Sequence, residues 1–423
     1  PEGSIDYSVT ATDLAGNQAT TSGSLLIDTT APTPFTGGLA ADSDTGSSNS
    51  DQITNKTQPF FSGRGEVGSE VSLSIAGNSY KTVVDDNGDW SLQVTNSLSD
   101  GDLNYTLTST DVAGNQSTLT GTVVVDTQVT LTGGLSQDSD TGRSQSDNIT
   151  NDQTPTFAGT GEPGAAITVT VDQKSYTTTV TEAGTWSVTV SDSFAEGNHL
   201  YRIETVDIAG NKGSLNGQFL IDITAPTDFT GGLSVADDTG RANDDGITQT
   251  VRPTFTGTVE AGSLVSLAIA GKTYAATVAA DGNWQVTVPT ALSEGEHAYV
   301  LTATDVAGNT STISDSITVD LSTSLTGGLA ATSDTGLAND DGYTKDNTPT
   351  FSGSAEALAN ISVSVGGKTY QGQADANGNW EVTATDALSD GAHSYTIIAT
   401  DVAGNQDSVS GDFTVDTQTF VTA

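Results

Sequence analysis

A five-residue motif, Asp-x-Ala-Gly-Asn, occurs five times in this chain of 423 residues. Its aspartates are Asp13, Asp111, Asp207, Asp305 and Asp401, so consecutive copies are 98, 96, 98 and 96 residues apart. A repeat of roughly one hundred residues has the size of a complete domain. The sequence therefore predicts a tandem array of similar domains, each with the same tight turn near its end.

Other motifs recur with the same spacing and define the domain boundaries. A short apolar segment ends at an aspartate in "LIDT", "VVDT", "LIDI", "TVDL" and "TVDT", and one tryptophan per repeat follows a glycine turn. These landmarks predict four complete domains, 29–126, 127–222, 223–320 and 321–416. Residues 1–28 are expected to be the last two strands of a preceding domain, and 417–423 the start of the next linker. Because the chain has no methionine and begins inside a repeat, we interpret it as a piece of a longer protein.

Within each repeat the hydrophobic pattern is that of β-strands. Segments such as "VSLSIAG" (71–77) and "ITVTVDQ" (167–173) alternate apolar with small polar residues, and Gly, Asn and Asp turns separate them. No segment has helical periodicity. About seven strands in roughly 97 residues predict an all-β fold, a tandem array of seven-stranded immunoglobulin-like β-sandwiches that forms an elongated rod.

Recurring large aromatic residues are expected to form the cores of these sandwiches. The first two sets are Phe61, Tyr80, Trp90 and Tyr105, and Phe157, Tyr176, Trp186 and Tyr201. Such residues could also form a platform for stacking sugars, but their alternation along strands favours the core.

The composition restricts the classes of partner. The 53 acidic and 12 basic residues give a formal net charge of −41, which repels nucleic acid and anionic membranes. Apolar residues, 34% of the chain, lie in alternating patterns and argue against disorder. No apolar run reaches the roughly 18 residues of a membrane span, and no signal peptide is visible. The chain has no cysteine, so an extracellular protein of this kind needs another form of cross-link, for which bound metal is the usual substitute.

No motif predicts an enzyme. The three histidines occupy equivalent positions, where the first domain has Leu103, so this position serves packing or the surface. There is no cysteine nucleophile, nucleophile elbow, phosphate loop or histidine-rich metal motif. Pairs of carboxylates could suggest a glycosidase, but they recur on turns in every domain and no long loops surround them. We therefore expect no catalytic activity.

The positions of the acidic residues predict calcium sites at the domain junctions. Strands of a sandwich alternate in direction, so the Asp-x-Ala-Gly-Asn turn and the loop carrying Glu162 lie at the pole that meets the end of the preceding domain. Asp126 should therefore approach Glu162 and Asp207, joined by Asp44 and Asp51 from the long loop of the first domain. Carboxylates that converge without Lys or Arg need a cation. Flexible loops with only oxygen ligands favour Ca2+ over magnesium, although the aspartates could also simply cap turns.

The same reasoning applies at each junction. The expected pairs are Asp28 with Asp111, Asp126 with Asp207, Asp222 with Asp305, and Asp320 with Asp401. The expected loop ligands are Asp44, Asp140, Asp238 and Asp334, followed by Asp51, Asp147, Asp245 and Asp341. Glu66, Glu162, Glu260 and Glu356 are further candidates. Asp42 and Asp138 correspond to Ala236 and Thr332, so the sequence leaves open a second calcium in the third and fourth long loops.

The chain resembles the bacterial immunoglobulin-like repeats of giant, type-I-secreted surface adhesins. The resemblance is carried by "TPTFAGTGEPGA" (154–165), "GTWSV" (184–188), "ETVDIAGN" (204–211) and "LIDITAPT" (220–227), and it extends over essentially the whole chain. It implies a calcium-stiffened extracellular stalk on the bacterial cell surface, secreted unfolded, that projects a terminal binding domain. The partners are then calcium ions and neighbouring repeats, with the host or surface ligand bound elsewhere in the full protein. Two alternatives are that these domains bind a glycan or protein themselves, or that they are an accessory module of a secreted enzyme.

Overall fold

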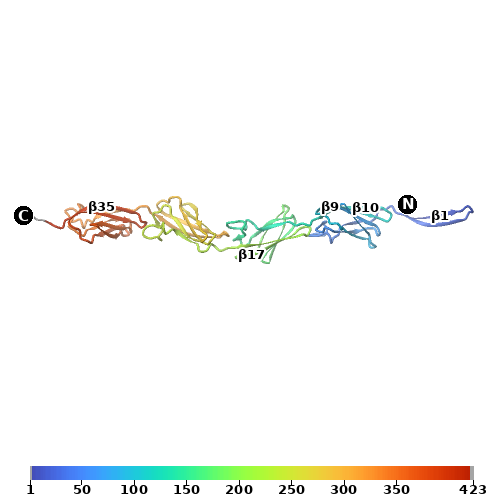
Figure 1. Ribbon diagram of the computed structural model, residues 1–423, viewed down its shortest axis with the longest axis horizontal. Coiled ribbons are helices and arrows are strands. Elements are labelled where there is room, and N and C mark those ends of the chain that lie inside the picture. The colour runs from blue at the N-terminus through green and yellow to red at the C-terminus, as the bar shows by residue number, and fades with distance from the viewer. Residues whose placement is uncertain (1, 420–423) are drawn as a thin grey trace, which may run out of the picture. The chain divides into compact units, whose positions relative to one another are not determined.

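All regular elements of the chain that the structure describes, residues 2–419, are β-strands (Figure 1). The structure is a computed structural model, and it confirms the all-β prediction. No helix in the described part is long and apolar enough to cross a membrane. The chain divides into two compact units, the first ending at Asp222 and the second beginning at Ile223. The first unit contains a hairpin and two sandwiches, and the second contains two sandwiches.

The first unit begins with the hairpin, made of β1 (Gly3–Thr12) and β2 (Gln18–Ile27). The strands of the first sandwich are β3 (Thr36–Leu39), β4 (Ile53–Thr54), β5 (Phe60–Arg64), β6 (Glu70–Ile75), β7 (Asn78–Val83), β8 (Asp89–Gln93), β9 (Gly101–Thr110) and β10 (Gln116–Val125). The strands of the second sandwich are β11 (Leu131–Leu135), β12 (Ile149–Thr150), β13 (Thr156–Gly161), β14 (Ala166–Val171), β15 (Lys174–Thr179), β16 (Thr185–Thr189), β17 (Gly197–Val206) and β18 (Lys212–Ile221).

The second unit repeats this order twice. The strands of the third sandwich are β19 (Thr230–Leu233), β20 (Ile247–Thr248), β21 (Thr254–Thr258), β22 (Leu264–Ile269), β23 (Lys272–Ala275), β24 (Thr277–Val278), β25 (Asn283–Thr287), β26 (Gly295–Thr304) and β27 (Thr310–Val319). The strands of the fourth sandwich are β28 (Leu325–Leu329), β29 (Tyr343–Thr344), β30 (Thr350–Ala355), β31 (Asn360–Val365), β32 (Lys368–Gln373), β33 (Asn379–Thr383), β34 (Gly391–Thr400) and β35 (Gln406–Val415).

Each sandwich has a small and a large sheet. In the first sandwich the strand orders are β3-β5-β8 and β4-β10-β9-β6-β7. The two-residue strand β4 pairs in parallel with β10, whereas the other neighbours are antiparallel. The first, second and fourth sandwiches therefore have the expected seven longer strands and one short strand that the alternation pattern does not reveal. In the third sandwich the strand after β22 is split, and its second piece, β24, joins the small sheet.

The core lies between the two sheets, as predicted. Phe61 is fully buried and packs edge-to-face on Tyr105, with ring centroids 5.0 Å apart. The Trp90 ring lies over Gly37, where an added Cβ would be 2.2 Å from Trp90 Cζ2. This packing explains why each "TGGL" segment pairs with one tryptophan. Tyr80 is only half-buried, at the margin of the core.

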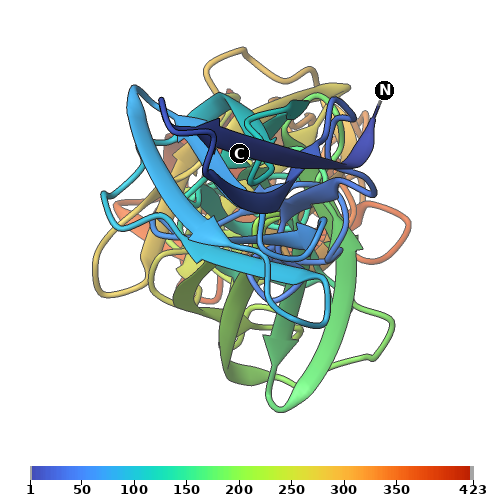
Figure 2. The same ribbon diagram turned by 90° about the vertical axis from the view of Figure 1, so that its right-hand side faces the viewer.

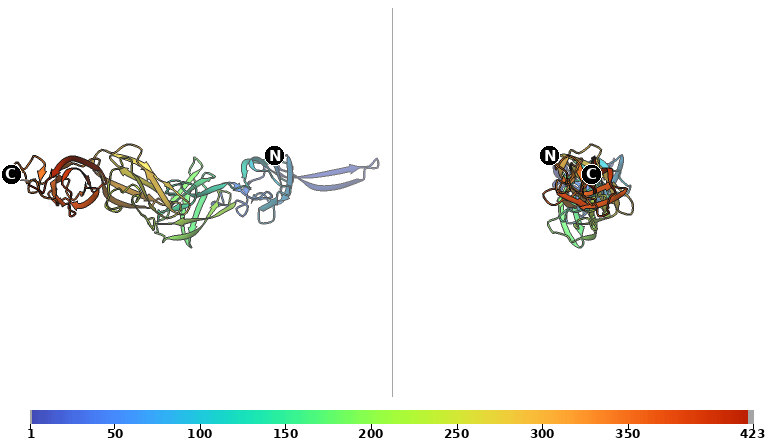
Figure 3. Two further views of the ribbon diagram at one scale, coloured as in Figure 1. Left: turned by 60° about the vertical axis from the view of Figure 1, so that its left-hand side comes forward. Right: turned by 90° about the vertical axis from the view of Figure 1, so that its left-hand side faces the viewer.

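The β1–β2 hairpin has the core pattern of a sandwich but no opposing sheet within the described residues. Its strands pair only with each other. Tyr7 and Leu25 are 51% and 58% exposed, whereas Tyr105 and Val123, the equivalent residues of β9 and β10, are buried. Figure 2 shows the hairpin, in dark blue, from its own end of the chain. In Figure 3 the hairpin is a two-stranded ribbon with no second layer, whereas the red strands of the fourth sandwich enclose a common interior. The assignment of residues 1–28 to a preceding sandwich stays a prediction, and residues 420–423 of the expected linker lie outside the described residues.

Candidate metal centre

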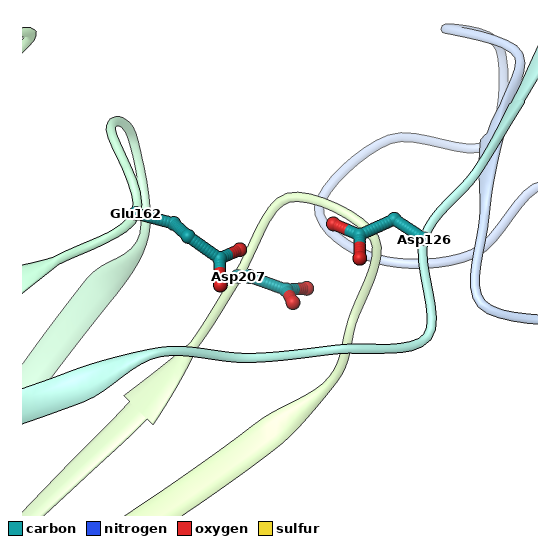
Figure 4. Close-up of side chains that lie close together, drawn as sticks. All are labelled: Asp126, Glu162 and Asp207. Carbon is teal, nitrogen blue, oxygen red and sulfur yellow. The ribbon is translucent and has the colours of Figure 1, made fainter. Parts of the chain in front are cut away.

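Three carboxylates from two sandwiches converge where the first sandwich ends. Asp126 directly follows β10, and its N–H donates a hydrogen bond to the Thr54 carbonyl at 2.9 Å. Glu162 lies in the loop between β13 and β14, and Asp207 in the turn between β17 and β18. One oxygen of each lies within 4.8 Å of the others, and Figure 4 shows the three carboxylates side by side. The geometry is the one that the alternation of strand direction predicts.

The second unit contains a matching cluster. Asp320 follows β27, Glu356 lies between β30 and β31, and Asp401 lies between β34 and β35. Their oxygens again lie within 4.8 Å of one another. In both clusters the turn aspartate is buried, with Asp207 and Asp401 4% and 2% exposed. We call these two groups the junction clusters.

The Asp-x-Ala-Gly-Asn motif builds the turn and also reaches across the junction. The Asn211 N–H donates to Asp207 Oδ1 at 2.8 Å, and the Asn211 side-chain amide donates to Asp207 Oδ2 at 2.8 Å. The same amide nitrogen lies 2.9 Å from the Asp126 carbonyl oxygen of the preceding sandwich. In the second unit Asn405 bonds in the same way to Asp401 and to the Asp320 carbonyl. The asparagine thus orients the aspartate, one oxygen of which lies within 4.8 Å of an oxygen of each of the other two carboxylates.

The bridging role of the motif's asparagine was missed, because the residue has an adequate explanation as a turn former. A signal was present in the sequence. The second position of the motif varies among Leu, Val and Ile, whereas the asparagine is the same in all five copies.

The junction clusters concentrate negative charge. The ion pairs of Arg64, Lys81, Lys174, His199, Arg202 and Lys368 are made with carboxylates outside these clusters. Burial raises the pKa of Asp320, and the charges of Asp401 and Glu294 add to the effect. Burial likewise raises the pKa of Glu356, with further contributions from Asp320 and Asp401. Ionised carboxylates in this arrangement repel one another, so the site is suited to a cation.

Glu294 is an additional acid that sequence reasoning did not identify. It precedes Gly295, at the start of β26, and with Asp320 and Glu356 it lines a surface hollow of about 460 Å³. An acid precedes the first glycine of the equivalent strand in every copy: Glu2, Asp100, Glu196, Glu294 and Asp390. Several of them bind the following linker, as when Thr127 Oγ1 donates to Asp100 Oδ1 at 2.9 Å. The recurrent acid–glycine pair was the available signal.

The other two predicted pairs, Asp28 with Asp111 and Asp222 with Asp305, are not part of the junction clusters. The Asn115 side-chain amide donates to the Asp28 carbonyl at 3.1 Å, which brings Asp28 to the turn that holds Asp111. Within the described residues, however, Glu66 does not join them in a three-acid cluster. The linker from Asp28 to Thr36 is two residues longer than that from Asp126 to Thr132 and contains proline, which changes its reach. Asp222 ends the first unit and Asp305 belongs to the second, so their pairing stays a prediction.

The acids of the long loops are not members of the junction clusters. We expected Asp44 and Asp51 to join Asp126, but their carboxylates bind inside their own loop. Asp44 Oδ2 accepts the Gln52 N–H at 3.0 Å, and Asp51 Oδ1 accepts the Ile53 N–H at 3.1 Å. The other three long loops have the same bonds, made by Asp140 and Asp147, Asp238 and Asp245, and Asp334 and Asp341.

The long loop nevertheless contacts the next sandwich of its unit. Thr45 Oγ1 donates to the Ala209 carbonyl at 2.6 Å, and Gly46 lies against the backbone of Ile208. In the second unit Thr239 Oγ1 donates to the Ala403 carbonyl at 2.8 Å, and Gly240 lies against Val402. The loop therefore rests on the same turn that supplies the buried aspartate of the junction cluster.

We expect Gly46→Ala to separate this loop from the next sandwich. An added Cβ would lie 1.8 Å from the Ile208 carbonyl oxygen, so the two backbones must move apart. Gly68→Ala is the matched control, because Gly68 has a similar positive φ, 84° against 93°, and no atom within 4 Å of the added Cβ. Hydrogen exchange should show loss of protection at the turn around Ile208 in Gly46→Ala alone. Equal loss of protection in both variants would contradict the contact.

Comparison with protein families gives a match over most of the chain. The family model described as "Bacterial Ig-like domain" matches residues 30–127, 129–223, 224–321 and 322–417. Among the curated proteins, no sequence matches this chain.

Several solved structures resemble the chain. A tetra-tandem repeat from the extending region of a large adhesion protein is 24% identical, with 87% of this chain and 97% of that chain covered and a TM-score of 0.34. A Ca2+-stabilized adhesin of an Antarctic bacterium that binds ice is 29% identical, with the same coverage and a TM-score of 0.31. A 1.5-MDa bacterial ice-binding adhesin is 22% identical over 64% of this chain and 93% of that chain, with a TM-score of 0.29.

Proposed function

Because this chain belongs to the family of bacterial immunoglobulin-like domains, we propose that it is a calcium-stiffened spacer of a giant bacterial surface adhesin. In this role the sandwiches hold a terminal binding domain away from the cell. The observation that carries the proposal is the pair of junction clusters, Asp126, Glu162 and Asp207, and Asp320, Glu356 and Asp401. The same three positions meet at both junctions, which favours a built site over a chance grouping of surface acids.

A cation at a junction cluster would connect the end of one sandwich to two loops of the next. Asp126 would bind it from the linker, and Glu162 and Asp207 from the following sandwich. The carboxylates offer only oxygen and lie on loops, a ligand set suited to calcium, whereas magnesium requires stricter octahedral geometry. Without the cation the three charges repel one another and favour separation of the two sandwiches. The junction would therefore be stiff when the ion is bound and flexible without it.

The location of the protein follows from the affinity expected for such sites. Extracellular calcium modules bind with dissociation constants of roughly 0.1–1 mM. We infer that the sites are empty in the cytosol, where the charge of −41 opposes compaction, and filled outside the cell. This fits secretion of the chain in an unfolded state, as a type I system requires. The extending region of a large adhesion protein and the Ca2+-stabilized adhesin, both of which this chain resembles, fit this role.

We expect calcium, and much less magnesium, to bind the chain and raise its unfolding temperature. Calorimetric titration of the chelator-treated protein with each chloride salt tests the selectivity, and thermal unfolding in the same buffers tests the stabilisation. Sodium chloride at equal ionic strength is the control for charge screening. Stabilisation by sodium alone, or equally by calcium and magnesium, would contradict the proposed site.

A further inference from the structure

Two hollows lie next to each other on the third sandwich, where the edges of its two sheets meet. Each has a volume of about 480 Å³, and Thr277 and Gln285 line both of them. In this sandwich β23 is the last strand of the large sheet and β24 the last strand of the small sheet. The two hollows therefore form one continuous groove beside the split strand, which we call the side groove.

Among the described residues, no charged side chain lines the side groove, although the chain carries a formal net charge of −41. The lining consists of Thr, Asn, Gln, Tyr and Trp together with small or apolar residues. The first sandwich has a hollow at the equivalent place, but Arg64, Asp85 and Asp89 line it, and Arg64 pairs with Asp89 at 2.9 Å. The two hollows are therefore suited to ligands of different charge.

Two alanines leave the side groove open. Ala275 and Ala279 line it at positions where each of the other three sandwiches has a larger side chain. The larger residues are Lys81, Thr177 and Gln371 at the first position, and Asp85, Thr181 and Asp375 at the second. A larger side chain at either position would occupy part of the space, so the groove is a property of the third sandwich and not of the repeat in general.

The tyrosine of the side groove lacks the acid that holds its counterparts. In the second sandwich the Tyr176 hydroxyl donates a hydrogen bond to Asp192 Oδ2 at 2.6 Å, and the fourth sandwich has the same bond at 3.1 Å. The third sandwich has Thr290 in place of this acid, so the hydroxyl of the half-buried Tyr274 is not held in this way. An aromatic ring with hydroxyl and amide side chains around it suits an uncharged polar ligand.

We propose that the side groove binds an uncharged oligosaccharide. Sugar hydroxyls both donate and accept hydrogen bonds, as do the side chains of Thr277 and Gln285, and the net charge of the chain repels acidic sugars. A peptide strand fits less well, because β24 already pairs with β25 and covers the strand edge to which a peptide would add. This binding would add to the stalk role and does not depend on it.

A glycan array tests this binding with the full chain in calcium buffer. The array carries uncharged oligosaccharides, among them cellohexaose, maltohexaose and mannohexaose, with sialylated glycans and a peptide of alternating Thr and Val as comparisons. Uncharged oligosaccharides should retain the chain, and the comparisons should not. Retention by the sialylated glycans or the peptide alone, or by nothing on the array, would overturn the proposal.

Variants that take residues from the other sandwiches locate the binding. Ala275→Lys introduces the residue of the first sandwich and should weaken the retained oligosaccharide by about tenfold or more in calorimetric titration, because the longer side chain fills the groove. Gln285→Ser, which introduces the residue of the first and second sandwiches, should also weaken it, and guards against misfolding of the first variant. Thr177→Lys makes the change at the equivalent position of the second sandwich and should bind as the wild type does.

The unfolding temperature of each variant shows whether it is folded. Wild-type affinity in both Ala275→Lys and Gln285→Ser, or an equal loss in Thr177→Lys, would place the binding elsewhere and overturn the proposal. Calcium binding should be unchanged in all three variants, so failure of the side groove is distinguishable from failure of the stalk role.

Discussion

Removal of calcium is expected to turn an extended chain into a flexible one while the strands of each sandwich remain. The cation would act where sandwiches meet, at the junction clusters, whereas each sandwich has its own aromatic core, such as Phe61 with Tyr105. Strands of about eight residues at roughly 3.3 Å each, with their loops, predict a calcium-bound length on the order of 150 Å for four sandwiches in series. Chelation should broaden the distribution of interatomic distances within the chain and lower the average distance.

Small-angle scattering with calcium, and after addition of chelator, measures this change directly. Circular dichroism of the same samples should retain most of the strand signal, and return of excess calcium should restore the original scattering curve. A maximum dimension that does not change on chelation would contradict the stiffening role. Loss of the strand signal together with the length would mean that calcium stabilises the sandwiches rather than their junctions.

The second large effect is expected from Asp126→Asn. This change removes the charge that the end of the first sandwich contributes to the cluster with Glu162 and Asp207. The variant should lose one bound calcium while the cluster of Asp320, Glu356 and Asp401 keeps its own. At a calcium concentration one hundred times the dissociation constant, the lost ion would correspond to about 2.7 kcal/mol of linkage stabilisation.

Calorimetric counting of sites and thermal unfolding in calcium test this expectation. Asp86→Asn is the matched control, because it removes the same charge from an exposed position, on the turn between β7 and β8. The control should keep the wild-type number of sites and unfolding temperature. If Asp126→Asn also kept that number, the assignment of Asp126 as a ligand would be wrong.

The repeat, the fold class and the cores followed from local pattern. A domain-sized period and strict alternation are properties of contiguous residues, so they appear in the sequence without knowledge of the fold. Even the meeting of Asp126, Glu162 and Asp207 could be predicted, because strands that alternate in direction place loops at one of only two poles. Here a topological rule was sufficient, since each acid lies within two residues of a strand end.

The tertiary structure decided how the remaining acids are grouped. Asp44 and Asp51 were expected at the junction, but the path of a thirteen-residue loop (42–54) depends on backbone bonds such as that from the Gln52 N–H to Asp44, which periodicity does not encode. Glu66 remains outside a cluster with Asp28 and Asp111, where the longer linker changes the reach. The contact of Asn211 with the Asp126 carbonyl and the side groove of the third sandwich are also visible only in three dimensions. Residue type and strand direction predict which pole a carboxylate reaches, but distances of a few ångströms between loops depend on packing across domains.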